Sequence, residues 1–477
     1  MDLVSQSGGF LTLLKKRNFL RLWLAQVISQ TIFNASNAAL IVLISLVSGN
    51  STTQIGLAII CFSLPAVLFG APAGVVVDHM SKRRVLWASN GLRALATIFF
   101  VLALFFDRRT LLPIIYLLTF IISTIGQFFT PAEGSTIPML VDEEELTPAL
   151  SLFNTTLMLA QALGFVLIAP IALFLLPTFT IYGITIDAVI QLYAIIAILY
   201  LVCSALVFAI PSASFVKSEV HYEKAVNNAL STQILNALSN VWDETKQGWK
   251  FVRQTKTLFL AVVQLSFAGV LILVIGEEAT PIVTKLLFLS PKLMAFIFAP
   301  AGIGLVAGSV LIPRVISRFG GSKTIFAGAL VLTGCMAALP LCALVAQVLQ
   351  PHGWNTNPLL LLTIAFIMCI AGFALDAINV PAQTAIQTYT PDWIKGRVLA
   401  LQLVLYNAAS IPVILILGAI TDSLNITNTL LIMAAMTLAF GLWGIYYERN
   451  HPHSELPNQE HAAATENSVA TSSAKSH

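Results

Sequence analysis

The sequence predicts an all-α membrane protein with twelve transmembrane helices arranged as two pseudo-symmetric six-helix halves. Three observations support this fold class: the composition suits lipid, long apolar runs recur along the chain, and a short motif repeats about 250 residues apart. Of the 477 residues, 57% are hydrophobic and 10% are charged, whereas roughly a quarter of the residues in an ordinary soluble domain are charged. Most of the surface is therefore suited to lipid and not to water.

The apolar runs have the length of membrane spans. A helix needs about 20 apolar residues to cross a bilayer core about 30 Å thick. Continuous runs, as opposed to alternating ten-residue segments, favour helices over barrel strands. The twelve runs cover residues 22–47, 55–77, 85–106, 111–129, 150–176, 188–210, 258–275, 293–312, 324–348, 359–375, 398–420 and 429–446.

The sequence lacks the signals of secreted, metal-binding and nucleotide-binding proteins. The first run is too long for the apolar part of a secretory signal, and no cleavage site follows it, so we expect it to remain as a helix. The five cysteines show no zinc-like spacing, and all seven histidines lie outside the runs. There is no nucleotide-binding glycine loop and no HExxH motif. We therefore expect no metal, no cofactor, no nucleic-acid partner and no enzymatic activity.

Basic residues are distributed unevenly between alternate loops. One set of loops, together with the termini, holds twenty Lys and Arg residues, and the other set holds four. Because basic loops remain cytoplasmic, both termini are expected in the cytoplasm. We expect a multi-pass protein of a bacterial inner (plasma) membrane that contacts membrane lipids and is monomeric.

The longest polar stretch separates the two expected halves, which cover residues 1–210 and 258–448. Between them, residues 211–257 mix Lys, Glu and Asn with Val, Leu and Trp, as in an amphipathic helix along the cytoplasmic membrane face. Residues 449–477 are rich in Ser, Ala, His and Glu without periodicity, so we expect a disordered cytoplasmic tail.

A short motif marks the internal repeat. Thr130-Pro131-Ala132-Glu133 is expected at the end of the fourth span, and Val380-Pro381-Ala382-Gln383 at the end of the tenth. Each is followed by a proline, an aspartate and an apolar run that begins with an Ala-Leu pair. Internal repeats of this kind are typical of alternating-access carriers.

The loop between the second and third runs carries a motif with a characteristic spacing. It reads Gly74-Val75-Val76-Val77-Asp78-His79-Met80-Ser81-Lys82-Arg83-Arg84, in which an Asp follows a Gly by four residues and precedes a basic cluster. This motif resembles the cytoplasmic loop signature of the major facilitator superfamily. With Asn18-Phe19-Leu20-Arg21-Leu22-Trp23-Leu24 and Ser89-Asn90-Gly91-Leu92-Arg93-Ala94, residues 10–448 most resemble the siderophore and macrolide exporters of that superfamily, the enterobactin exporter-like branch.

The resemblance implies the major facilitator fold, and the charges of the loop suggest a mechanical role. The Asp78 carboxylate can accept hydrogen bonds from free amides at the start of another helix and can pair with Lys82, Arg83 or Arg84. Such contacts would latch the two halves together on the cytoplasmic side. The alternative is that these charges only set the topology.

The chain departs from related drug/proton antiporters at three points. The fourth run has no arginine, Gly164-Phe165 replaces the usual Gly-Pro pair of the fifth, and Phe33-Asn34 stands where members of the branch often have an aspartate. The expected fold is unaffected, whereas proton antiport and drug specificity lose support.

Two spans carry polar side chains in a stripe along one face. A carrier binds its cargo near the midplane of the membrane, so such stripes are candidates for the cargo site. By resemblance, spans one, four, seven and ten line the central cavity. The alternative is that these amides bond packed helices to one another. The stripes are Gln26, Gln30, Asn34 and Asn37 in the first span, and Asp376, Asn379, Gln383 and Gln387 in the tenth.

Three carboxylates are candidates for proton coupling. Asp376 lies in an apolar span, where an ionised carboxylate must find a cation or take up a proton. Glu277 and Glu278 stand near the outer end of the seventh span, and only one of two adjacent residues can face a cavity. The alternative for this pair is an exposed helix end that binds Lys285.

Arg93 is the basic residue within an apolar span. It lies about two turns inside the third span, so we expect a buried partner, either Glu133 or Asp78. We interpret this charge pair as structural.

These observations predict a secondary transporter that exports an amphipathic small molecule, driven by the proton gradient, through rocking of its two halves. A second transport hypothesis is a lipid or lysolipid flippase. A hypothesis of another class is a receptor-like membrane protein that does not transport. The substrate itself does not follow from these residues.

Overall fold

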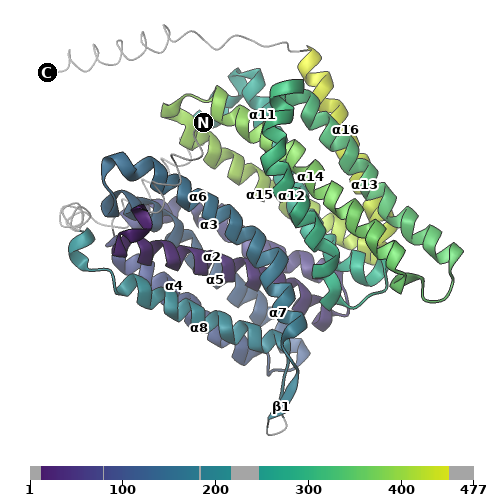
Figure 1. Ribbon diagram of the computed structural model, residues 1–477, viewed down its shortest axis with the longest axis horizontal. Coiled ribbons are helices and arrows are strands. Elements are labelled where there is room, and N and C mark those ends of the chain that lie inside the picture. Colours follow the sequence, from purple (N-terminus) through teal and green to yellow (C-terminus); the bar gives the residue numbers. More distant parts are fainter. Residues whose placement is uncertain (1–11, 79, 182–183, 216–245, 451–477) are drawn as a thin grey trace.

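The computed structural model describes residues 12–78, 80–181, 184–215 and 246–450, which form a helical protein of two bundles (Figure 1). The purple and blue helices of the N-terminal half lie beside the green and yellow helices of the C-terminal half (Figure 1). Most of the expected connector helix and the tail after residue 450 lie outside the described residues.

The N-terminal half contains six spanning segments, of which one is interrupted. Its elements are α2 (Arg17–Ser48), α3 (Thr52–Asp78), α4 (Lys82–Ala103), α5 (Arg108–Leu140), the short η1 (Glu143–Glu145), the segment α6 (Leu146–Ala162), η2 (Leu163–Ile168) and α7 (Ala169–Leu175), the strands β1 (Phe179–Ile181) and β2 (Ile184–Ile186), α8 (Ala188–Phe208) and η3 (Ser212–Phe215). The antiparallel hairpin β1–β2 pairs Phe179 with Ile186 and was not expected from the sequence.

The C-terminal half contains six long helices. Its elements are α11 (Lys256–Pro281), η4 (Ile282–Leu286), η5 (Pro291–Leu293), α12 (Met294–Phe319), α13 (Gly321–Leu349), η6 (Trp354–Thr356), α14 (Pro358–Tyr389), α15 (Asp392–Ser423) and α16 (Ile426–Asn450).

Within the described residues, eleven helices are long and apolar enough to cross a membrane. The remaining expected span, residues 150–176, is built from α6, η2 and α7 in direct succession. The middle piece, η2, is a π-helix, and π-helical turns form where a helix is locally widened. Each of the twelve predicted runs therefore corresponds to a helical segment.

Two helices continue past the repeated motif that was expected to end them. The fourth and tenth spans were expected to end at Glu133 and Gln383, but α5 continues to Leu140 and α14 to Tyr389. The prolines of the repeated motif lie inside these helices, since side-chain hydroxyls and neighbouring helices satisfy freed backbone groups in membrane helices. The Ser135 hydroxyl also donates to the carbonyl of Pro131 at 2.8 Å, one turn earlier in α5.

The two halves pack their helices in corresponding pairs. In the N-terminal half α3 packs on α5, α4 on both α5 and α8, and α2 on α6 and η2. Six spans later in the chain, α12 packs on α14, α13 on both α14 and α16, and α11 on α15. The same six-helix arrangement is thus built twice, as the repeated motif predicted.

A close helix crossing stabilises the C-terminal half. Any side chain at Gly304 of α12 would overlap the carbonyl of Cys369 in α14, and one at Gly372 of α14 would overlap the carbonyl of Ala301. Small residues allow such backbone contact, which replaces hydrophobic burial as the source of helix association in lipid. The α12–α14 pair therefore forms a rigid unit around the tenth span.

The bundle has two distinct ends. The hairpin end carries β1 and β2 (bottom of Figure 1), together with the start of α3 and the end of α15. The basic end is opposite and carries the start of α2, the loop before α4 and the end of α8.

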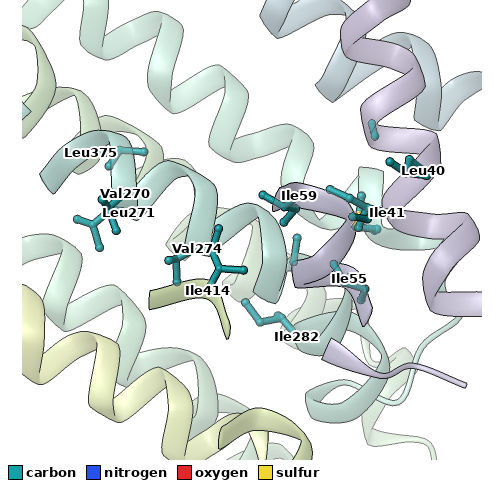
Figure 2. Close-up of a cluster of buried hydrophobic side chains, with 14 of the residues drawn as sticks. Leu40, Ile41, Ile55, Ile59, Val270, Leu271, Val274, Ile282, Leu375 and Ile414 are labelled. Atoms are coloured by element: carbon teal, nitrogen blue, oxygen red, sulfur yellow. The ribbon is translucent and has the colours of Figure 1, made fainter. Parts of the chain in front are cut away.

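A cluster of buried hydrophobic residues joins the two halves near the hairpin end, and we call this contact the seal. The cluster includes side chains from α2 and α3 of the first half and from α11 and α15 of the second. Figure 2 shows part of it, with Ile55 and Ile59 of α3 close to Val274 of α11 and Ile414 of α15. In contrast, the second cluster of buried hydrophobic residues lies near the basic end, and its described members, from Leu13 to Phe215, all belong to the N-terminal half.

Candidate functional site

Asp376 is buried at the centre of the C-terminal half. Its side chain is 7% exposed and packs against Gly308 of α12, where an added methyl group would lie 3.0 Å from the carboxylate Oδ2. The Asn379 side chain and the backbone of Ser309 are its polar neighbours. The described residues provide no ion pair to this carboxylate. Asn379 and Gln383, which belong to the same predicted stripe, are half-buried.

The amides of α2 pack against the interrupted span. Gln26 is 3% exposed and donates to the carbonyl of Phe153 in α6 at 3.4 Å, while its own carbonyl oxygen has no partner among the described residues. Asn34 donates to the carbonyl of Gln30 at 2.8 Å and contacts the site of Gly164 in η2. Gln30 is half-buried and Asn37 is 8% exposed.

Glu277 and Glu278 lie at the seal, and the interpretation as an exposed helix end does not hold because both side chains are 0% exposed. Glu278 Oε1 accepts a hydrogen bond from the Thr421 hydroxyl of α15 at 2.8 Å. Both carboxylate oxygens of Glu277 lack a hydrogen-bond partner among the described residues. The two neighbours thus occupy different surroundings, one bonded to α15 and one unpartnered.

Asp422, at the end of α15, joins the two halves and was not singled out from the sequence. Its carboxylate accepts from the backbone amides of Thr52 at 2.8 Å and Thr53 at 3.0 Å and from the Ser51 hydroxyl at 2.8 Å. Lys285 forms an ion pair with it at 2.7 Å and also donates to the Thr52 hydroxyl at 3.1 Å. We call these five residues the clasp.

The clasp satisfies the start of α3 from the other half of the protein. The first amides of a helix have no partner within it and attract negative charge. The sequence offered one signal for Asp422, namely that it directly follows an apolar run. Asp78, at the end of α3, follows an apolar run in the same way. Sequence spacing does not reveal that α3 and α15 are neighbours.

The basic cluster of the loop motif binds within its own half. Arg83 donates to the carbonyls of Phe208 at 2.6 Å and Ile210 at 2.9 Å, at the end of α8. Lys82 donates to the carbonyl of Val77 at 2.6 Å, and Arg84 is exposed. Asp78 is the last residue of α3, and Gly74 lies one turn earlier. These contacts hold the basic end of the N-terminal half together.

Arg93 and Glu133 are both buried but do not form the direct ion pair that the sequence suggested. Arg93 donates to the Ser29 hydroxyl at 3.1 Å and lies 5.4–5.7 Å from the ring centroids of Phe33, Phe129 and Tyr200. Aromatic faces attract a guanidinium group. Aromatic rings and a hydroxyl thus surround this charge, and Glu133 interacts with it electrostatically from beyond ion-pair distance.

A further charge contact lies outside the spans, at the basic end. Lys16 pairs with Asp142 at 2.7 Å and with Glu145. The hydrogen bond to Asp142 is the main reason that the pKa of Lys16 is raised, and the hydrogen bond from Lys16 holds the pKa of Asp142 below its usual range. The contact fixes the start of α2 to the turn between α5 and α6.

The arrangement defines a class of protein. Two repeated six-helix halves meet at one end, and carboxylates and amides are buried at membrane depth among apolar helices. Such polar groups mark transport pathways, and paired repeats allow one half to rock against the other. The fold and these residues are therefore those of an alternating-access membrane carrier.

The comparisons with known proteins identify the family. A family model described as Major Facilitator Superfamily matches residues 22–369. This match covers more than half of the chain, which belongs to the Major Facilitator Superfamily of membrane transporters. A curated relative, the uncharacterised MFS-type transporter YkuC of Bacillus subtilis (strain 168), is 28% identical over 138 residues, which is 29% of this chain and 31% of that protein. The match thus spans about a third of the length of that relative.

Solved structures share the fold at low identity. The nucleoside transporter NupG has a TM-score of 0.63 and 13% identity, over 90% of this chain and 98% of that chain. A D-xylose-proton symporter has a TM-score of 0.64 and 15% identity, over 89% and 97%. The inward open conformation of the xylose transporter XylE from E. coli has a TM-score of 0.62 and 14% identity, over 93% and 98%. At these identities the likeness shows the fold alone.

Proposed function

We propose that this transporter exports an amphipathic small molecule of drug or siderophore type in exchange for protons. The observation that carries the proposal is the buried carboxylate of Asp376, which lies among apolar helices without an ion pair in the described residues. A carboxylate at membrane depth is costly when ionised and is therefore suited to carry a proton. The resemblance of residues 10–448 to siderophore and macrolide exporters supports the outward direction.

The proton gradient supplies enough energy for this task. A proton that crosses 100 mV releases about 2.3 kcal/mol, and each pH unit adds about 1.4 kcal/mol. One proton per cycle would therefore sustain a cargo gradient on the order of a hundredfold. A single titratable carboxylate in the path is sufficient for such coupling.

The charge distribution supports an orientation for the sealed state. We place the basic end in the cytoplasm of a bacterial inner membrane, since basic loops remain inside. The hairpin end then faces outward, and the seal closes the outer gate. The described residues of α5 have no extensive packing with α14 or α15, which is consistent with an inward-facing state.

The proposal is tested by export from cells. Efflux of a panel of dyes, antibiotics and siderophores is compared in cells with and without the protein, with Asp376→Asn, and with a protonophore. We expect both treatments to abolish export against a concentration gradient. Asp187→Asn is the matched control, because Asp187 caps α8 within one half through a 2.9 Å bond to the Ile190 amide. Export that ignores both treatments would exclude proton coupling, and movement of a labelled lipid alone would indicate a flippase.

A further inference from the structure

The Glu277 carboxyl group is enclosed where the two halves cross most closely. An added methyl group would lie 2.5 Å from its Oε1 at Gly56 of α3 and 2.6 Å from it at Gly418 of α15. The same added group at Gly56 would lie 2.8 Å from Ile414, and that at Gly418 would lie 3.2 Å from Thr53. The absence of side chains at both glycines thus leaves room for this carboxyl group between the halves.

The enclosed group has no described partner for a negative charge. Its side chain is 0% exposed, and neither oxygen has a hydrogen-bond partner among the described residues. A buried ionised carboxylate needs donors or a cation, whereas the neutral acid is much less costly to enclose.

The charged groups around Glu277 do not supply that compensation. On its own helix the neighbour is Glu278, and α15 contributes Asp422, both of which are acidic. The nearby lysine, Lys285 of η4, forms its ion pair with Asp422. From α3 the start of the helix, Thr52 to Cys61, contains no charged residue.

We infer that Glu277 is a proton-binding site for the outer gate, and that it must bind a proton from the outer solution before the two halves can close around it. This inference rests on the proposed function for the orientation of the hairpin end. When the gate is open, α3 and α15 separate and the Glu277 carboxylate meets water. One proton then moves from a hydronium ion to a Glu277 oxygen, the carboxylate charge is neutralised, and the acid enters the glycine-lined contact.

The inference identifies which of the candidate carboxylates acts at the gate. Glu278 is equally buried, but it accepts the Thr421 hydrogen bond at 2.8 Å, and this hydroxyl is close to Thr429 at 2.7 Å. One oxygen of Glu278 therefore has a donor when the gate is shut and its Oε2 has none among the described residues, whereas neither oxygen of Glu277 has one. Asp376 lies elsewhere, between α12 and α14.

The test measures closure directly and needs no substrate. Spin labels are placed at Phe106 and Leu424, which are exposed at the hairpin end of either half, after replacement of the native cysteines. Distances between the labels are measured in lipid nanodiscs from pH 5 to pH 9. We expect the short distance to dominate at low pH and the long distance to gain at least tenfold at high pH. Glu277→Gln, which mimics the neutral acid, should keep the short distance at every pH.

Further variants separate this role from a structural one. Glu278→Gln should retain the pH response, and Glu277→Asp should restore it with a changed midpoint. Retention of the pH response in Glu277→Gln would overturn the inference, as would its loss in Glu278→Gln. Sodium at fixed pH is the remaining arm, and closure driven by sodium in place of protons would also overturn it. If closure does not depend on Glu277 but efflux is proton-driven, the gate site is excluded and the proposed function is retained. If closure depends on Glu277 but efflux is not proton-driven, the gate site is retained and the proposed function is excluded.

Discussion

Removal of the Asp422 charge should open the hairpin end. Asp422→Asn keeps the size of the side chain but abolishes the ion pair with Lys285 and weakens the bonds to the two amides at the start of α3. The ion pair with Lys285 lies within the C-terminal half, whereas the bonds from Asp422 to the α3 amides join the halves, so they exist while the gate is shut. The open state replaces them with bonds to water, and its free energy should change little.

The magnitude follows from the contacts. Each hydrogen bond to a charged group contributes about 1.5–3 kcal/mol, and loss of a helix N-cap costs about 0.5–2 kcal/mol. The bonds that the asparagine of the variant still accepts reduce this loss. The ion pair with Lys285 lies within the C-terminal half, so its loss affects the closed and open states alike and is not counted. We take a net loss of about 2 kcal/mol, which lowers the ratio of closed to open molecules about thirtyfold.

The spin-label distance between positions 106 and 424 reports this ratio. If about one molecule in a hundred is open in the wild-type protein, about one in four should be open in Asp422→Asn. Asp187→Asn is the matched control, since Asp187 also caps a helix at the hairpin end but within its own half. Lys285→Met should have a smaller effect than Asp422→Asn. Equal distance distributions in wild type and Asp422→Asn would refute the role of the clasp.

Two further predictions concern stability. Gly304→Ala should lower the free energy of unfolding by about 1–3 kcal/mol, because the methyl group overlaps the Cys369 carbonyl. The control is Gly334→Ala, at an exposed and open site of α13, which should be neutral or slightly stabilising when both variants are melted in the same detergent. Equal melting temperatures of the two variants would contradict the close crossing of α12 and α14. The Lys16–Asp142 contact should stabilise the protein across the neutral range. Its Asp142 part is lost as pH falls through the lowered pKa, and its Lys16 part as pH rises through the raised pKa. The stability difference between wild type and Lys16→Met should therefore vanish in acid, and a difference that grows below about pH 4 would exclude this reading.

The loop motif illustrates what sequence resemblance did and did not provide. Gly74 and Asp78 identified the family, and the family model confirmed it over residues 22–369. The resemblance suggested that Arg83 helps to latch the halves, whereas in this conformation Arg83 binds the end of α8 in its own half. A latch contact that forms in one state of a carrier cannot be located by sequence alone, because the motif is the same in both states.

The sequence also could not distinguish the two carboxylates at the seal. Glu277 and Glu278 were visible as adjacent carboxylates, and each had the same expected properties. Their different surroundings come from Gly56 and Gly418, two glycines that are far apart in the sequence and carry no local signal for this role. The contact of α3 with α15 places them on either side of one side chain.

The sequence by itself determined the solvent, the spans and the repeat. Apolar runs and basic loops are local properties, and lipid forces each run into a helix because no water is present to satisfy an open backbone. The tertiary structure alone decided which end is shut, that Asp422 binds the start of α3, and that Arg93 is surrounded by aromatic rings. These features depend on contacts between distant segments, whose energies are set by where helices cross and not by the residues beside them in the chain.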